Sequence, residues 1–392
     1  MKRFRIALIW KVIIACVLGC GLGRLLPVSV IRVFTTFNYL FSQYIGFMVP
    51  LIIVGLVTPA ICKMGSKAGK ILVFTMLLAY LSSITAGFFS YGISVNLFPK
   101  LPGSLHMEIG ETIAKDTMPY FTLDIPAMLS VTTSLTLSFV VGILLTTTGK
   151  DYLKNVVLDF EELIMKAISK TLIPLLPIYI FGIFLEMSHS GEMLPMISVF
   201  AIIFVTILTM SILWLLILFC ISGAIAHRNP LKSLVAMLPA YLTALGTSSS
   251  AAAIPVTMSC AQKCGVSEPV RNFTIPLCAT VHLPGSMLKI TACAITIMML
   301  HGTTVTAPLI INFIMMLAII AIAAPGVPGG MIMASLGVLN SILGFDDSSQ
   351  AMMITLYIVM DSFGTACNVT SDGAIALIVD KFFRQSQNQP TN

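Results

Sequence analysis

Charged residues are scarce in this sequence. Asp, Glu, Lys and Arg make up 10% of the 392 residues, whereas soluble domains carry about 25%. Hydrophobic residues reach 57%, and the mean hydropathy is +0.99. This shortage of charge excludes a soluble globular domain. We therefore expect a polytopic integral protein of the inner or plasma membrane.

Three kinds of functional motif are missing as well. The net charge is +6, but the basic residues form no patch that could neutralise phosphates, so we expect no nucleic-acid partner. The nine cysteines include no CxxC pair and no cysteine–histidine spacing typical of zinc, so packing roles are the better interpretation and no metal centre is expected. A G-x-S-x-G nucleophile elbow, which would favour an enzyme, is also missing.

Long apolar runs occupy most of the chain. A membrane core of about 30 Å requires roughly 20 apolar residues per helix. Two long helices are expected at 271–300 and 351–380, and six more in the first half of the chain, which gives eight transmembrane helices. The six apolar runs lie at 6–26, 36–62, 71–97, 128–148, 161–187 and 194–226. Most Lys and Arg residues lie on one side of these spans, so the positive-inside rule predicts cytoplasmic N- and C-termini.

Two apolar segments are interrupted by serine, glycine or proline. The segment 233–262 contains Gly-Thr-Ser-Ser-Ser from residue 246, and 308–344 contains Pro-Gly-Val-Pro-Gly-Gly from residue 325. The spacing from Ser249 to His282 is 33 residues, and so is the spacing from Pro328 to Asp361. Paired broken segments of this kind indicate a structural repeat around a binding site near the middle of the membrane. Two re-entrant loops that only pack are the alternative.

The last predicted helix carries a polar stripe. Asp361, Thr365, Asn368 and Asp372 follow one another at i, i+4, i+7 and i+11, which places them on one face of a helix. Carboxylates inside a membrane are costly unless they face a cavity and have a partner. The stripe therefore indicates a polar site, with a structural ion pair as the alternative.

These features together resemble the glutamate-transporter homologue family, the dicarboxylate/amino acid:cation symporters. The resemblance covers the chain in span order and is sharpest at 248–257, 276–280, 326–329 and 361–372. In the last helix it is nearest to the bacterial serine/threonine branch. It implies an all-α integral membrane protein with eight transmembrane helices plus two re-entrant helical hairpins, a glutamate-transporter-like elevator fold and a homotrimer.

The resemblance also implies a division of the chain. Scaffold and trimerisation helices would occupy 1–70 and most of 128–226, with the helix at 71–97 and one helix of 128–226 joining the moving part. The transport domain core would be 231–383, made of hairpin 1, helix 7, hairpin 2 and helix 8. An extracellular loop at 98–127 and a disordered tail at 384–392 complete the expected organisation.

By position, the resemblance implies that Asp361 holds the amino group of a substrate and that Asn368 and Ser250 hold its carboxylate. Residues 326–329 would form the tip of the extracellular gate. The expected substrate-binding residues are Ser249, Ser250, Ser286, Gly326, Val327, Gly329, Asp361, Gly364, Thr365 and Asn368. The expected cation-binding residues are Thr280, His282, Asn368 and Asp372. The coupling ion would be Na⁺ or H⁺, with no other cofactor.

Two departures from the family bear on the substrate. Gly364 and Ser248 stand where members with acidic substrates carry arginine, so the bidentate clamp for a second carboxylate is missing. The expected function is therefore cation-coupled symport of a neutral amino acid such as serine, threonine or alanine. The alternative is an acidic amino acid or dicarboxylate, with Lys289 replacing the arginine and protons as a conceivable coupling ion.

Helix 7 departs further. Where the family has Asn-Met-Asp-Gly-Thr, this chain has His282, Leu, Pro284, Gly and Ser286, so at least one cation site is expected to be lost. His282 suits either proton coupling or a buried hydrogen-bonding role. We expect the Lys289 ammonium to enter the space at Gly364. It would then serve as a structural partner of Asp361 or Asp372, as a stand-in for a lost cation, or as a clamp on a substrate carboxylate.

Two other classes of function compete. A serine hydrolase would use the serines at 248–250 with His282. The lack of a nucleophile elbow in the sequence argues against a hydrolase. A channel would use the broken hairpins as filter loops, but no ring of repeated carbonyls or charges is evident.

Overall fold

The structure, a computed structural model, describes residues 8–64, 70–100, 117–148, 151–190, 193–324 and 329–383. The regular elements of these ranges are helical and no strand occurs among them, as the composition predicts. The elements of the first half are α1 (Leu8–Leu22), α2 (Val28–Met64), α3 (Lys70–Leu97), the short η1 (Phe98–Lys100), α4 (Val131–Thr148), α5 (Asp151–Ala167), the π-helical turn η3 (Ile168–Leu172), α6 (Ile173–Ser190) and α7 (Met193–Ala226). The second half contains α8 (Pro230–Ala236), α9 (Leu238–Thr247), α10 (Ser250–Lys263), α11 (Glu268–Val281), α12 (Pro284–Leu300), α13 (Ala307–Ala323), α14 (Gly330–Leu343), α15 (Asp347–Val359) and α16 (Asp361–Phe383).

Several helices are long and apolar enough to cross a membrane. By length and composition there are five in the described part of the chain, or six if the bent pair α15 and α16 is one span. The first helix and α4 contribute only shorter apolar stretches, Lys11–Leu22 and Thr136–Leu145. A multi-pass membrane protein is therefore supported, while the predicted count of eight spans is not established.

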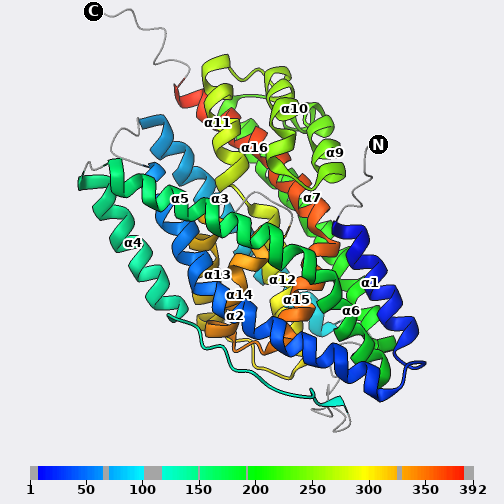
Figure 1. The fold of residues 1–392 in the computed structure, drawn as a ribbon. Coiled ribbons are helices and arrows are strands. Elements are labelled where there is room, and N and C mark those ends of the chain that lie inside the picture. Colours follow the sequence, from blue (N-terminus) through cyan, green and yellow to red (C-terminus); the bar gives the residue numbers. More distant parts are fainter. Residues whose placement is uncertain are drawn as a thin grey trace, which may run out of the picture.

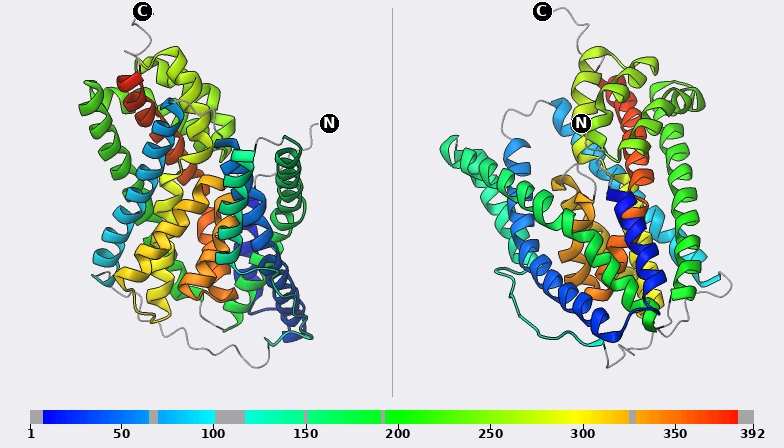
Figure 2. Two further views of the ribbon diagram at one scale, coloured as in Figure 1. Left: turned by 90° about the vertical axis from the view of Figure 1, so that its left-hand side faces the viewer. Right: turned by 45° about the vertical axis from the view of Figure 1, so that its right-hand side comes forward.

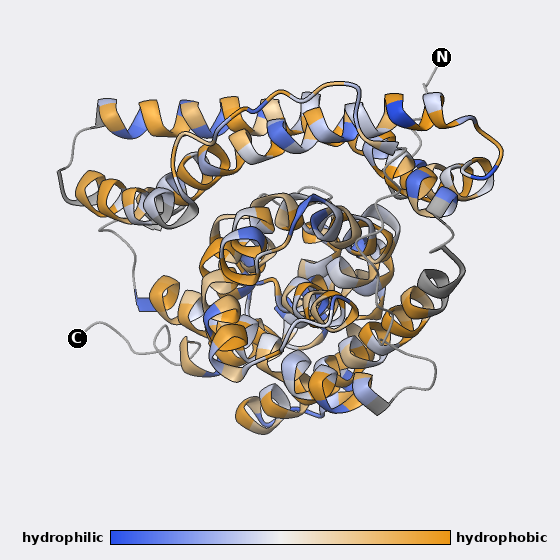
Figure 3. Cartoon of the chain, turned by 90° about the horizontal axis from the view of Figure 1, so that it is seen from below, coloured by the Kyte–Doolittle hydropathy of each residue, from blue (hydrophilic) through white to orange (hydrophobic). Residues whose placement is uncertain are grey.

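The early helices form a layer of their own. α2 packs against α4, α5 and α6, and α1 lies along α6. The approach of α1 to α6 is close at Gly19, where an added Cβ would lie 2.8 Å from the carbonyl oxygen of Phe181. Seen from below, a curved row of helices flanks a rounded bundle (Figure 3). The row contacts the bundle where α2 meets α13 and α14 and where α1 and α6 meet α15.

The rounded bundle is built around α12 and α16. α3 packs along α12 and α13, and α7 packs along α16 and α12, so two helices of the first half join the second half (Figure 1). Every residue of α12 except Met299 is buried, and so is α16 from Gly364 to Asp380. Polar side chains on these two helices are therefore enclosed by protein.

The two interrupted segments are helical hairpins, and they occupy opposite ends of the bundle (Figures 1 and 2). In the first, α9 packs against α10, and the chain turns at Ser248, whose φ of 50° is left-handed. Ser249 then caps α10 by accepting the backbone N–H of Ala252 at 3.3 Å. In the second, α13 packs against α14, and Gly329 has a φ of +74°, a conformation for which glycine is suited.

The two helices predicted to be continuous are both broken, and the breaks lie beside predicted site residues. The predicted helix 271–300 consists of α11 and α12, separated at His282 and Leu283, because the residue before Pro284 is disfavoured in helical conformation. The predicted helix 351–380 consists of α15 and α16, bent by 60° at Met360. Asp361 therefore begins a half-helix instead of lying inside a continuous one.

Candidate functional site

The tips of both hairpins meet the same end of α16. Gly329, at the start of α14, donates its backbone N–H to Asp361 Oδ2 at 3.0 Å. Ser248, at the first tip, shares a hydrogen bond of 2.6 Å with the hydroxyl of Ser362. Asp361 and Ser362 are the first two residues of α16. The bend between α15 and α16 thus gives both broken segments a common meeting point.

A buried lysine also reaches this point. Lys289 Nζ, on α12, lies 3.2 Å from Asp361 Oδ1, and its side chain is fully buried. The same ammonium lies 3.7 Å from the ring centroid of Tyr357 on α15, a cation–π distance. The two oxygens of Asp361 are thus shared between an ammonium and the tip of the second hairpin.

Two glycines allow α12 and α16 to cross closely. A Cβ at Gly285 would lie 2.5 Å from the carbonyl oxygen of Gly364, and one at Gly364 would lie 2.5 Å from Lys289 Nζ. The Lys289 side chain therefore fills the space beside Gly364, one helical turn after Gly285. It pairs there with Asp361 instead of Asp372.

Asn368 lies one turn further along the same crossing. Its Oδ1 accepts the backbone N–H of Gly285 at 2.7 Å, and its Nδ2 donates to Ser286 Oγ at 3.3 Å. The Ser286 hydroxyl also lies 3.2 Å from the hydroxyl of Tyr357. This chain of polar contacts continues from the Lys289 and Asp361 pair into the helix break.

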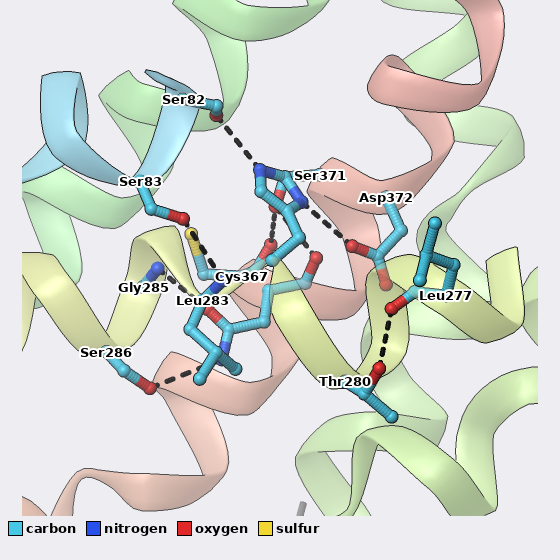
Figure 4. Close-up of polar contacts among 12 residues, drawn as sticks. Ser82, Ser83, Leu277, Thr280, Leu283, Gly285, Ser286, Cys367, Ser371 and Asp372 are labelled. Carbon is cyan, nitrogen blue, oxygen red and sulfur yellow. Dashed lines mark hydrogen bonds and ion pairs between the residues drawn. The ribbon is translucent and has the colours of Figure 1, made fainter. Parts of the chain in front are cut away.

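His282 occupies the break between α11 and α12 and connects three elements, and its partners Ser82 and Asp372 are labelled in Figure 4. Its Nδ1 lies 2.9 Å from Asp372 Oδ1 on α16, and its Nε2 lies 2.9 Å from Ser82 Oγ on α3. The next residue, Leu283, donates its backbone N–H to Ser83 Oγ at 3.3 Å. Side chains of α3 and α16 thus provide hydrogen-bond partners for polar groups that the helix break leaves without partners in their own helices. The break also separates His282 from Lys289, so the two do not share a partner.

Comparison with known proteins decides the family. The model of the sodium:dicarboxylate symporter family matches residues 8–382. The chain belongs to this family. A serine/threonine transporter, SstT, of Acinetobacter baumannii (strain AYE) is 27% identical over 412 residues, which cover 97% of this chain and 98% of the relative. An excitatory amino acid transporter of Caenorhabditis elegans is 25% identical over 248 residues, covering 61% of this chain and 48% of the relative. Excitatory amino acid transporter 3 of Mus musculus is 30% identical over 166 residues, covering 42% and 32%.

Family membership decides between the competing classes. The protein is a membrane symporter and not an enzyme, so the hydrolase interpretation of residues 248–250 and His282 is wrong. The partners of the His282 imidazole are Asp372 and Ser82, and Ser82 lies on α3 instead of at the first hairpin tip. Coupled transport by a symporter also replaces the channel interpretation.

The remaining predicted residues of this symporter are spread around the core of the site. Thr365 is buried on α16, and Ser250 is buried at the first turn of α10. Thr280 is exposed and bonds the carbonyl oxygen of Leu277 within its own helix. Gly326 and Val327 lie outside the described residues.

No group of three or more His, Cys, Asp or Glu side chains that could hold a metal ion occurs in the described part of the chain.

Sequence reasoning missed several residues that contact the predicted ones or the helix break beside them. They are Ser82, Ser83, Tyr357 and Ser362. Two adjacent serines inside the apolar run 71–97 were a visible signal, since polar side chains within a span require partners. Tyr357 carried no such signal, because its ring fits an apolar helix without one.

Proposed function

We propose that this symporter couples the movement of a neutral amino acid, such as serine, threonine or alanine, to the movement of a cation across the cytoplasmic membrane. The observation that carries the proposal is the convergence of both hairpin tips on Asp361 and Ser362. A site closed by two separate tips is accessible to solutes only when one of them moves. This is the arrangement that alternating access requires.

The substrate would bind between α16 and the tips. Asp361 would hold the ammonium group of the substrate, and Asn368 with Ser250 would hold its carboxylate. The Gly329 contact supports this assignment, because the gate tip and the proposed ammonium partner already touch. Ser249, Ser286, Gly326, Val327, Gly364 and Thr365 complete the proposed binding surface.

The charges at the site favour a neutral substrate. No arginine stands at Gly364 or Ser248, and the Lys289 ammonium that fills the space beside Gly364 is paired with Asp361. A second carboxylate would therefore lack the bidentate guanidinium partner that arginine would provide in this region. The full-length similarity to serine/threonine transporters agrees with this choice over the acidic alternative.

Asn368 and Asp372 would supply oxygen ligands to the coupling cation, with His282 and Thr280 beside them. Oxygen ligands suit a hard cation such as Na⁺. His282 bonds Asp372 in the structure, so a cation at this carboxylate would share it with the imidazole. The ion is Na⁺ or H⁺, and the experiment below separates them.

An elevator motion would carry the site across the membrane. In this proposal the rounded bundle of 231–383 with α3 and α7 moves against the curved row of early helices, which forms the scaffold of a homotrimer. The packing of the two groups supports the division, because each makes its main contacts within itself. Both termini would lie in the cytoplasm.

Uptake into proteoliposomes tests the function. Purified protein is reconstituted and offered radiolabelled serine, threonine, alanine, aspartate and succinate, first under an inward sodium gradient and then under an inward proton gradient. We expect serine, threonine or alanine to accumulate under one of the gradients, with little aspartate or succinate. Accumulation of succinate or aspartate alone would contradict the proposal.

A further inference from the structure

We infer that Lys289 is a built-in counter-cation: its ammonium neutralises Asp361 in the empty carrier, and the ammonium of the substrate replaces it there. The inference rests on the proposed function and assigns a role to a residue that the function does not require. It also predicts which half of the transport cycle depends on Lys289.

The first observation is that the two carboxylate oxygens of Asp361 have different partners. Asp361 Oδ1 accepts from Lys289 Nζ at 3.2 Å, and Oδ2 accepts from the Gly329 N–H at 3.0 Å. Both side chains of the ion pair are buried. The lysine therefore neutralises the carboxylate that accepts the Gly329 N–H, so the start of α14 contacts a charge-balanced pair.

The second observation is the space that the lysine occupies. Gly364 has no Cβ, and one placed there would lie 2.5 Å from Lys289 Nζ. The Tyr357 ring lies 3.7 Å from the same nitrogen. An ammonium displaced from Asp361 thus keeps a cation–π contact, so it can leave the carboxylate without losing every favourable interaction.

The physical argument concerns the empty carrier. A carboxylate without a partner is costly in a buried, membrane-embedded site. A carrier that has released its substrate would have to cross the membrane with Asp361 in this state. With Lys289 in place the empty site is neutral, and binding of an amino acid exchanges one ammonium for another. Lys289 therefore matters for the return of the empty carrier and not for the movement of the loaded one.

Net uptake and exchange separate these two movements. Net uptake into vesicles without internal serine requires the empty carrier to return, whereas exchange against internal serine does not. For Lys289→Gln we expect net uptake to fall at least about tenfold more than exchange, because only the empty state then holds an unpaired buried carboxylate. The half-saturating serine concentration for exchange should not rise. Lys381→Gln, which removes an exposed lysine at the end of α16, is the matched control and should leave the ratio of the two rates unchanged.

Gly364→Ala tests the same inference while keeping every charge. Its methyl group would meet the flexible end of Lys289 and push the ammonium away from Asp361. We expect the same unequal loss, with net uptake falling more than exchange. This variant decides the matter if Lys289→Gln yields no folded protein.

Three results would overturn the inference. Equal loss of net uptake and exchange would make Lys289 a structural residue. A tenfold rise in the half-saturating serine concentration would make it a clamp on the substrate carboxylate. Unchanged rates in both variants would remove any role in transport. If the unmodified protein moves no amino acid in either assay, the proposed function itself fails, and this outcome is distinct from the other three.

Discussion

His282 Nδ1 lies 2.9 Å from Asp372 Oδ1, and both side chains are buried. The imidazole also reaches Ser82 at 2.9 Å. One side chain thus connects the break between α11 and α12 to α16 and to α3. The resemblance to the family implies an amide at this position. The larger imidazole reaches two partners that lie on different helices.

The first prediction concerns stability. His282→Ala removes a partner from a buried carboxylate and from a buried hydroxyl, so we expect the free energy of unfolding to fall by about 2–4 kcal/mol. Ser82→Ala removes one of the two contacts and should cost about 1 kcal/mol. Unfolding of the purified protein in detergent, followed by intrinsic fluorescence, measures both. His301 is exposed, and His301→Ala should change little. Equal effects of His282→Ala and His301→Ala would show that the bridge does not stabilise the fold.

The second prediction concerns the coupling ion. His282→Asn replaces a nitrogen ligand beside Asp372 by an amide that can offer oxygen, which hard cations prefer. If the uptake experiment shows Na⁺ to be the coupling ion, we expect sodium to stimulate serine uptake at a lower concentration in this variant than in the unmodified protein. A sodium titration of uptake into proteoliposomes measures the change. An identical titration curve would mean that His282 does not border the cation position.

The third prediction concerns the crossing of α12 and α16. Gly285→Ala would place a methyl group 2.5 Å from a backbone oxygen and 2.8 Å from Cys367 Cβ. Because a backbone oxygen cannot move aside as a flexible side chain can, we expect a loss of about 1–3 kcal/mol in stability and a strong loss of uptake. Gly246→Ala, in α9, meets nothing within 4 Å and serves as the control. Normal uptake by Gly285→Ala would show that the close crossing is not required.

The fourth prediction concerns the first hairpin tip. Ser248→Ala and Ser362→Ala each remove the same hydroxyl pair of 2.6 Å. Each should raise the half-saturating serine concentration about 2- to 10-fold, the effect of roughly 0.5–1.5 kcal/mol for one hydrogen bond. The double variant should be no worse than either single variant, because the two residues act through one contact. Additive losses would mean that each serine acts separately.

Much of the secondary structure could be predicted from periodicity and composition. The run predicted at 71–97 forms α3 from Lys70 to Leu97, α9 and α10 meet at the first predicted interruption, and α13 ends just before the second. The polar stripe of the last helix lies within one continuous helix, α16. These features depend on local sequence, which is why a single chain suffices to predict them.

The breaks were harder to predict. Pro284 was a visible signal for the break at Leu283, since the residue before proline avoids helical conformation. The bend at Met360 carries no proline or glycine, and the meeting of two tips at Asp361 depends on packing between distant segments. In the structure the Lys289 ammonium lies beside Gly364, and only the resemblance to the family, in which an arginine occupies that position, indicated this space. That Lys289 pairs with Asp361 and not with Asp372 depends on the bend at Met360, and the periodicity of the sequence did not indicate that bend.

The central claim is that Asp361 binds the substrate, and serine binding to purified protein tests it most directly. Isothermal titration calorimetry compares the unmodified protein with Asp361→Asn and with Asp380→Asn, which alters another buried aspartate of the same helix, one hydrogen-bonded to Ser267. We predict that Asp361→Asn abolishes serine binding while Asp380→Asn retains it. Undiminished serine binding by Asp361→Asn would contradict the account.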